Sequence, residues 1–290
     1  MSDALFSHAV EKLREMRVSP TAPCKICDGE SSPFDIVDFN KSCVQGQYAF
    51  GLKAIPVIYR MCKQCQFIFT DFGDAFCGNE WATHVYNDDY VKVDPEYLHA
   101  RPCRNAREII TLLAGRQETT VGLDYGGGNG TTADLLRANG WAFDCHDPYG
   151  RTELSPERLG HYNFCSAMEV FEHTPDPVAS LDTMLKMATP GKLLILIGTG
   201  THDGYVSKET RLSWWYAAPR NGHVSLYSRK SLRMLAERFG LTYSCGRGGT
   251  SHLLARGVSE SNTRALLLRG KLLRRVRSAL RMWTGDLAEG

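Results

Sequence analysis

The sequence predicts an α/β protein with a mostly parallel sheet that ends in an antiparallel hairpin, preceded by a small cysteine-rich module. Three observations predict this: paired cysteines near the start, a glycine-rich turn between a strand-like and a helix-like run, and alternating strands and helices behind it. The 290 residues allow one large domain or two modest ones, and the contents of 43% hydrophobic and 23% charged residues are ordinary for a globular chain.

Charge and hydropathy exclude several classes of protein. Lys and Arg number 34 against 32 Asp and Glu, so no overall nucleic-acid-binding surface is expected. No apolar run reaches the roughly 18 residues of a membrane span, and the first twenty residues lack the apolar core of a signal peptide. We therefore expect a cytoplasmic protein and interpret the ten cysteines as thiols in a reducing compartment.

Two Cys-x-x-Cys pairs lie near the start of the chain. Cys24 and Cys27 form the first pair, and Cys62 and Cys65 form the second. Each pair can bind one ion with two thiolates from a tight turn, and two such turns complete a tetrahedron. A redox dithiol needs only one pair. We therefore predict a structural zinc ion in a zinc-ribbon module, whose strand-like run Phe67-Ile68-Phe69 follows the second pair.

A glycine-rich turn spans Gly126 to Gly130. It follows a predicted strand over 119–126 and precedes a predicted helix over 131–139, which Gly140 ends. A second strand over 141–146 comes next. This order is typical of half of a nucleotide-binding sheet.

Acidic residues near this turn indicate which nucleotide it binds. The spacing Gly126-x-Gly128-x-Gly130 departs from the dinucleotide fingerprint, and Asp124 would repel a diphosphate. The same carboxylate suits a ligand that carries an ammonium and a sulfonium group, which favours S-adenosylmethionine over NAD. Asp147, after the second strand, would accept hydrogen bonds from the ribose hydroxyls.

The α/β alternation continues to residue 256. We predict a strand over 163–170, a helix over 178–188 with Asp176 as its N-cap and Pro177 at its first position, and a strand over 192–199. The remaining elements are an amphipathic helix over 228–239 and a hairpin formed by 241–245 and 251–256.

The motifs VGLDYGGGNG, HDPY, SAMEVFEHTPDP, GKLLILIGTG and GHVSLYSRKSLRMLAERFGL together resemble a class I S-adenosylmethionine-dependent methyltransferase with a Rossmann-like sheet. With the zinc-ribbon start and Tyr86-Asn-Asp-Asp-Tyr90, the chain is similar to bacterial methyltransferases that act on sugar nucleotides and surface-polysaccharide precursors. The resemblance covers about residues 20 to 256 and implies methyl transfer to a sugar-containing small molecule. Only fifteen residues, 148–162, precede the next strand, so the third strand and the acidic adenine contact usual in this family are predicted to be shortened or absent.

The resemblance also implies roles for individual residues. His223 would abstract the acceptor proton as general base, with His173 and Tyr86 as further catalytic candidates. The candidate cofactor-binding residues are Asp124, Gly126, Gly128, Gly130, Asp147, Met168, Glu169, Tyr90 and Arg101. The candidate acceptor-binding residues are Trp214, Trp215, Tyr216 and Arg220, because aromatic side chains beside an arginine suit a sugar or a phosphate.

Amphipathic helices are predicted at both ends of the chain. Leu5, Val10, Leu13 and Met16 have helical spacing, and Leu268, Leu272, Val276, Leu280 and Trp283 form a stripe among seven basic residues. The basic helix could dock on its own domain, on a dimer mate, on an acidic partner or on the inner membrane face.

We expect domains at 1–80, 81–257 and 258–290. Two alternatives to a sugar methyltransferase stay open: a methyltransferase for a quinone-like molecule or a nucleic-acid base, and a non-catalytic zinc-ribbon scaffold. The near-zero net charge disfavours nucleic acid, and the intact glycine turn disfavours the scaffold.

Overall fold

The computed structural model describes residues 19–44, 48–76 and 78–270. The chain forms two compact units, each of which we describe by itself. The first is built from the described parts of 1–97, 169–183 and 199–239, and the second from those of 98–168, 184–198 and 240–290. The predicted helix that contains Leu5 and Met16 lies outside the described residues.

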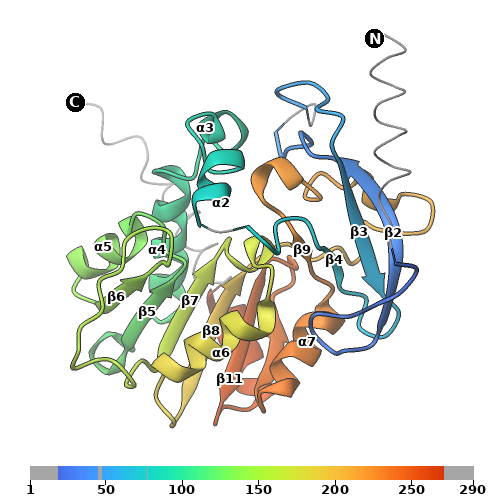
Figure 1. Ribbon diagram of the computed structural model, residues 1–290. Helices are drawn as coiled ribbons and strands as arrows, with labels where there is room; N and C mark the ends of the chain where they lie inside the picture. Colours follow the sequence, from blue (N-terminus) through green and yellow to red (C-terminus); the bar gives the residue numbers. More distant parts are fainter. Residues whose placement is uncertain (1–18, 45–47, 77, 271–290) are drawn as a thin grey trace, which may run out of the picture. The chain divides into compact units, whose positions relative to one another are not determined.

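The first unit contains a five-stranded antiparallel sheet (Figure 1). Its strands, in spatial order, are β1 Ala22–Pro23, β2 Glu30–Asp38, β3 Pro56–Cys62, β4 Ile68–Thr70 and β9 Ser225–Leu226. The strand predicted around Phe67-Ile68-Phe69 is confirmed as β4. The edge strand β9 comes from a segment more than 150 residues later in the chain, so the cysteine-rich start and the region around residue 225 form one structure.

Short helices complete this unit. They are α2 Gly78–His84, α3 Tyr90–Val93, η2 Phe171–His173, η3 Arg211–Ser213, η4 Pro219–Asn221 and α7 Arg229–Arg238, and α6 Pro177–Met187 begins here. The predicted cap of α6 is confirmed, since the Ala179 N–H donates to the Asp176 carboxylate at 2.9 Å. The core packs Tyr59, Ile68 and Leu226 of the sheet against Trp81 and Tyr90 of the helices.

The second unit contains a six-stranded mixed sheet. Its strands, in spatial order, are β10 Thr242–Cys245, β11 Ser251–Arg256, β8 Leu193–Gly198, β7 Phe164–Met168, β5 Val121–Tyr125 and β6 Ala142–His146. The last four are parallel to one another, and the β10–β11 hairpin is antiparallel. The predicted α/β class and the terminal hairpin are both confirmed.

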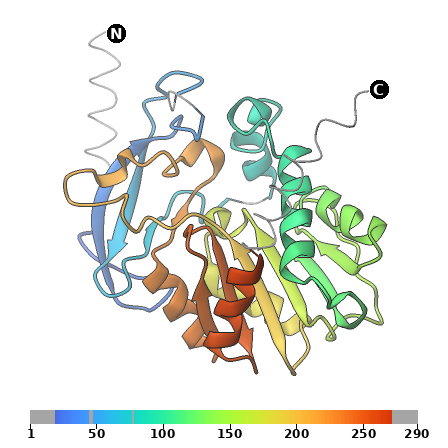
Figure 2. The same cartoon turned by 180° about the vertical axis from the view of Figure 1, so that it is seen from behind.

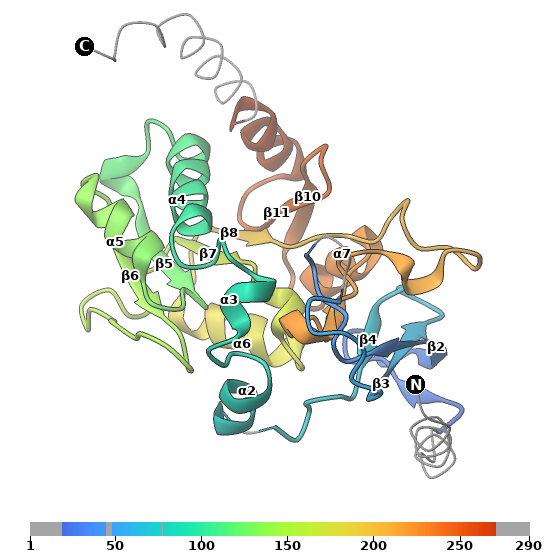
Figure 3. The ribbon, with the colours of Figure 1, turned by 90° about the horizontal axis from the view of Figure 1, so that it is seen from above.

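The described part of this unit also contains the helices α4 Ala100–Leu112 and α5 Thr131–Ala138, a helix over 260–270, the end of α6, and a 3₁₀ turn, η1, at Gln117–Thr119. Seen from above, α4 and α5 lie side by side (Figure 3). The helix over 260–270 and α4 lie on one face of the sheet (Figure 2), where Leu266 and Leu267 share a core with Ile109.

That packing corrects the predicted stripe at the C-terminal end. Leu268 is 50% exposed, whereas Leu266 and Leu267 are buried. The described part of the helix therefore docks on its own unit through a face one to two residues away from the predicted one. Residues 271–290, with the rest of the stripe, lie outside the described residues.

The segment between β6 and β7 forms no strand. It is fully described, and it contributes only isolated bridges, Cys145 with Glu153 and Tyr162 with Ala188. The expected loss of a third strand is thus confirmed. Among the described helices, none combines the length and the apolar character that a membrane crossing requires.

Candidate functional site

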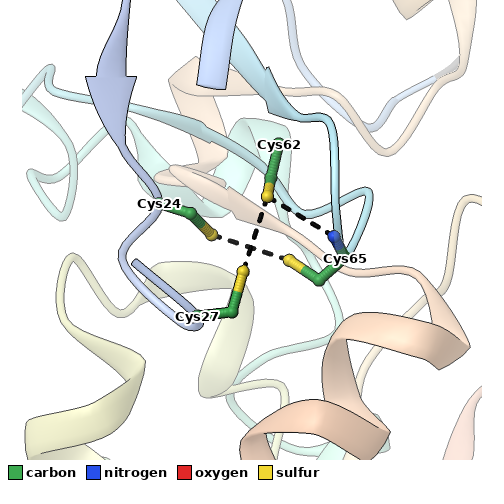
Figure 4. A group of neighbouring side chains, drawn as sticks. All are labelled: Cys24, Cys27, Cys62 and Cys65. Carbon is green, nitrogen blue, oxygen red and sulfur yellow. Dashed lines mark hydrogen bonds between the residues drawn. The ribbon is translucent and has the colours of Figure 1, made fainter. Parts of the chain in front are cut away.

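The four paired cysteines come together at one end of the first unit's sheet (Figure 4). The Sγ atoms of Cys24 and Cys65 are 3.6 Å apart, and those of Cys27 and Cys62 are 3.5 Å apart. A tetrahedral zinc ion with Zn–S bonds of about 2.3 Å needs sulfur atoms roughly 3.8 Å apart. The predicted cluster therefore has the dimensions of a zinc site made of four cysteines.

Backbone amides surround these sulfurs as they do in zinc knuckles. The Ile26 N–H donates to the Cys24 Sγ at 3.4 Å, and the Gln64 N–H donates to the Cys62 Sγ at 3.4 Å. A hydrogen bond from Cys65 lowers the pKa of Cys24 to about 5, whereas burial raises the pKa of Cys27 to about 11. Four such thiols side by side could hold zinc, because a cation removes the cost of ionising all of them.

In the second unit, the glycine turn follows β5 as predicted. The Gly126 N–H donates to the His146 carbonyl at 2.7 Å, which fixes the turn to the end of β6. Gly128 and Gly130 have φ of +59° and +80°, a region that favours glycine. A Cβ on Gly127 would lie 2.6 Å from the Asp124 carboxylate, so the backbone must pass directly over that group.

Asp124 is buried beneath this turn. Its carboxylate accepts a hydrogen bond from the Ser166 hydroxyl at 2.8 Å, a partner that sequence reasoning missed because Ser166 lies on the neighbouring strand β7. Burial raises the pKa of Asp124 to about 7, partly offset by that bond, and the charge of Asp147 raises it further. A cationic ligand above the turn would stabilise the ionised form.

The raised pKa of Asp124 makes stability depend on pH. Between about pH 4 and pH 7 the folded protein holds a proton that the unfolded chain releases, so this group's contribution to stability falls as the pH rises. We expect the stability of Asp124→Asn relative to wild type to increase by roughly 2 kcal/mol between about pH 5 and about pH 7. Urea unfolding of both proteins at the two pH values measures this, and an unchanged difference would contradict the burial of an ionisable Asp124.

Asp147 follows β6, and its carboxylate already has two partners. Its oxygens accept hydrogen bonds from the N–H groups of Gly128 and Tyr149, both at 2.8 Å. The Arg151 N–H donates to the Gly128 carbonyl at 2.8 Å, so residues 147–151 lie against the glycine turn. A carboxylate has about four acceptor positions, which leaves two for ribose hydroxyls. The sequence did not predict this folding of 147–151.

The remaining candidate cofactor residues lie at the ends of elements. Met168 ends β7, and its side chain occupies the space that a Cβ on Gly198 would need. Glu169, the next residue, has φ of +57°, a conformation that stores strain in a non-glycine residue. Arg101 is the second residue of α4. In the first unit, the Tyr90 hydroxyl lies 3.4 Å from the Asp94 carboxylate and from the Asn221 carbonyl.

The three catalytic candidates lie close together in the first unit. The rings of His173 and His223 are 4.9 Å apart between centroids, and the Tyr86 ring lies 6.0 Å from His173. A Cβ on Gly222 would be 3.1 Å from both the His173 Nδ1 and the Tyr86 hydroxyl. The structure therefore brings together residues from three distant parts of the sequence, although their catalytic roles stay predictions.

Buried hydrogen bonds orient His223. The ring Nδ1 lies 2.7 Å from the Tyr216 carbonyl, and because a carbonyl only accepts, Nδ1 carries a proton. In the neutral ring Nε2 then carries the lone pair. The Tyr59 hydroxyl donates to the His223 carbonyl at 2.6 Å, and the Val224 N–H donates to the Glu172 carbonyl at 2.9 Å. These bonds hold the His223 segment against η2.

Glu172 is a site residue that the sequence analysis passed over. Its side chain is fully buried, and one oxygen accepts a hydrogen bond from the Tyr216 hydroxyl at 2.5 Å. Burial raises its pKa well above the usual range, and the charge of Glu169 raises it further. The signal available in the sequence was its position directly before His173.

The four candidate acceptor residues differ in how exposed their side chains are. Trp214, Tyr216 and Arg220 are buried, whereas Trp215 is 50% exposed. Arg220 donates to the Val85 carbonyl at 2.7 Å and to the Asn87 side chain at 2.9 Å, so two of its donors already hold the segment 85–87. Trp215 is the candidate whose ring surface is most accessible.

The sequence matches a family described as a methyltransferase domain over residues 97–245, just over half of the chain. The chain belongs to this methyltransferase family. A comparison with curated proteins found no match.

Solved structures similar to the methyltransferase include other methyltransferases. The mitomycin 7-O-methyltransferase MmcR is 12% identical with a TM-score of 0.44, over 64% of this chain and 61% of that chain. The plantazolicin methyltransferase BpumL, in complex with SAH, is 17% identical with a TM-score of 0.43, over 69% and 90%. A possible histamine N-methyltransferase from Thermotoga maritima is 12% identical with a TM-score of 0.40, over 58% and 96%. This chain thus spans about three fifths of the length of MmcR.

The cofactor of such a methyltransferase is S-adenosylmethionine, and the residues around the glycine turn suit it. The backbone passes within contact distance of a buried carboxylate, and an anionic diphosphate would be repelled there. The ammonium and sulfonium groups of S-adenosylmethionine would be attracted instead. Asp124, the glycine turn and Asp147 are the residues that would hold it.

Proposed function

We propose that this methyltransferase transfers the methyl group of S-adenosylmethionine to a small, sugar-containing acceptor. The observation that carries the cofactor assignment is the buried Asp124 beneath a glycine turn that leaves no room for a Cβ at Gly127. The acceptor class rests on the resemblance to sugar and polysaccharide-precursor methyltransferases and on the exposed ring of Trp215, which suits stacking on a sugar.

S-adenosylmethionine supplies an activated methyl group on a sulfonium, so the protein must position the acceptor and assist the loss of its proton. We assign that assistance to His223, whose Nε2 carries the lone pair because Nδ1 donates to the Tyr216 carbonyl. His173, Tyr86 and Trp215 would position the acceptor. Met168, Glu169, Tyr90 and Arg101 stay candidates for contacts to the cofactor.

We also propose that the four-cysteine cluster holds a structural zinc ion. Four thiolates fill a tetrahedral site, so the ion would stabilise the first unit and take no part in the transfer.

Mass spectrometry of acceptors tests the proposed acceptor class. The zinc-loaded protein is incubated with S-adenosylmethionine that carries a deuterated methyl group, together with a panel of sugar nucleotides, quinone-like molecules and nucleosides. We expect a deuterated methyl group on at least one sugar nucleotide and on none of the other compounds. Methylation confined to a quinone-like molecule or a nucleoside would replace the acceptor class, and a protein without any transfer would support the scaffold alternative.

A further inference from the structure

Three side chains of metal-ligand type converge in the first unit. Glu172, His173 and His223 each place one ligand atom within 4.8 Å of the others. The first two are neighbours in η2, and the third is brought to them by the bond from the Val224 N–H to the Glu172 carbonyl. The fold therefore fixes the backbone on both sides of this group.

One carboxylate oxygen of Glu172 is buried without a hydrogen-bond partner among the described residues. Its side chain is 0% exposed, and Oε1 accepts from the Tyr216 hydroxyl, but Oε2 has no hydrogen-bond partner among the described residues. A buried carboxylate oxygen without a partner costs free energy, because it has lost its hydrogen bonds to water. A cation next to Oε2 would remove this cost.

His223 already has the surroundings of a metal-bound histidine. A ligating ring usually donates its second N–H to a carbonyl or carboxylate, which orients the ring and directs the other nitrogen to the metal. The His223 Nδ1 makes this bond to the Tyr216 carbonyl at 2.7 Å. Tyr216 therefore orients two members of the group, Glu172 through its hydroxyl and His223 through its carbonyl.

We propose that Glu172, His173 and His223 bind one divalent transition-metal ion. Imidazole and carboxylate ligands without thiolate suit Mn²⁺, Fe²⁺, Co²⁺ or Zn²⁺. Ligand bonds of about 2.1 Å place two ligand atoms at most roughly 4.2 Å apart, so a contraction of about half an ångström closes the group around an ion. Three protein ligands leave coordination positions for water or for an oxygen of a second molecule.

The use of the ion rests on the proposed function, although its binding does not. A hydroxyl group of the acceptor that coordinates the ion would lose its proton more readily: the O–H bond breaks, the electron pair stays on the metal-bound oxygen and the proton passes to water. His223 would then assist the loss of the acceptor proton as a ligand of the ion and not as a general base.

Titration with Mn²⁺ tests this site in the full-length protein loaded with one equivalent of zinc, which the four cysteines take in preference to a site without thiolate. Mn²⁺ competes poorly for a cluster of four cysteines, and the EPR signal of the free ion reports how much is bound. We expect one equivalent to bind, and we expect Glu172→Gln and His223→Asn to weaken binding at least about tenfold. His202→Asn is the matched control, since His202 is a buried histidine of the same unit whose Nε2 lies 2.8 Å from the Gln66 carbonyl, outside the group.

Pulsed EPR of the wild-type protein with bound Mn²⁺ keeps the test independent of how well the variants fold. We expect coupling of the electron spin to imidazole nitrogen. Absence of Mn²⁺ binding at millimolar concentration, binding without nitrogen coupling, or folded variants that bind as wild type would each overturn the inference. S-adenosylmethionine binding is measured on the same samples. A protein that binds Mn²⁺ but not S-adenosylmethionine would contradict the proposed function and leave the inferred ion site standing.

Discussion

Replacing His223 with alanine is expected to lower methyl transfer by about 10²- to 10⁴-fold, the usual range for losing a group that assists proton transfer. The variant should still bind S-adenosylmethionine with wild-type affinity, because the glycine turn and Asp124 belong to the other compact unit. Steady-state turnover of the methylated acceptor measures the first effect, and calorimetry with the cofactor measures the second.

His161→Ala is the control for this substitution, since His161 is exposed and lies outside the group around His223. It should leave turnover within about twofold of wild type, as surface substitutions usually do. Unchanged turnover in His223→Ala would remove this residue from the reaction. A loss of cofactor binding in the same variant would show that its effect is structural.

Substituting Cys62 with serine is expected to lower the zinc content by one ion per chain and to destabilise the first unit by several kcal/mol. Structural zinc contributes on the order of 10 kcal/mol in isolated zinc-binding peptides, and Cys62 is a fully buried member of the cluster. Zinc content by atomic absorption and thermal unfolding by circular dichroism provide the two measurements.

Cys103→Ser serves as the matched control, because Cys103 is a partly buried cysteine of α4 outside the cluster. It should retain the zinc content of the wild-type protein. Full zinc occupancy and unchanged unfolding of Cys62→Ser would contradict a structural metal site at the four cysteines.

Local signals in the sequence were sufficient for most of the second unit. Gly140, with φ of +78°, ends α5 where predicted, and the hairpin of β10 and β11 lies within a residue of the predicted bounds. In the first unit, the α6 cap at Asp176 was predicted from a similar local signal, a side-chain acceptor before the first turn. Such signals are readable because the residues that make them are neighbours in the chain.

Contacts between residues far apart in the chain could not be predicted from the sequence. The Lys41 Nζ donates to the carbonyls of Leu212 and Trp214, at 2.5 and 2.8 Å, although these residues lie far along the chain from Lys41. Arg220 reaches the Val85 carbonyl in the same way and is held within the core, although its residue type suggested an acceptor contact. Neither bond has a local pattern that could predict it.

Long-range contacts also explain which parts of the candidate site could not be predicted from the sequence. Individual residues could be selected by type, as His173, His223 and Tyr86 were, and the structure places them together. Glu172 gains its importance from burial and from the distant Tyr216 hydroxyl, and neither is visible in the sequence. The partner of Asp124, Ser166, likewise depends on the pairing of β5 with β7.

Isothermal titration calorimetry of the zinc-loaded, full-length protein with S-adenosylmethionine and, separately, with NAD tests the cofactor assignment most directly. We predict saturable heat with one S-adenosylmethionine per chain, lost or strongly weakened in Asp124→Ala, and no saturable heat with NAD. Saturable heat with NAD, or none with S-adenosylmethionine, would contradict a pocket in which a buried carboxylate selects a cationic sulfur compound over a diphosphate.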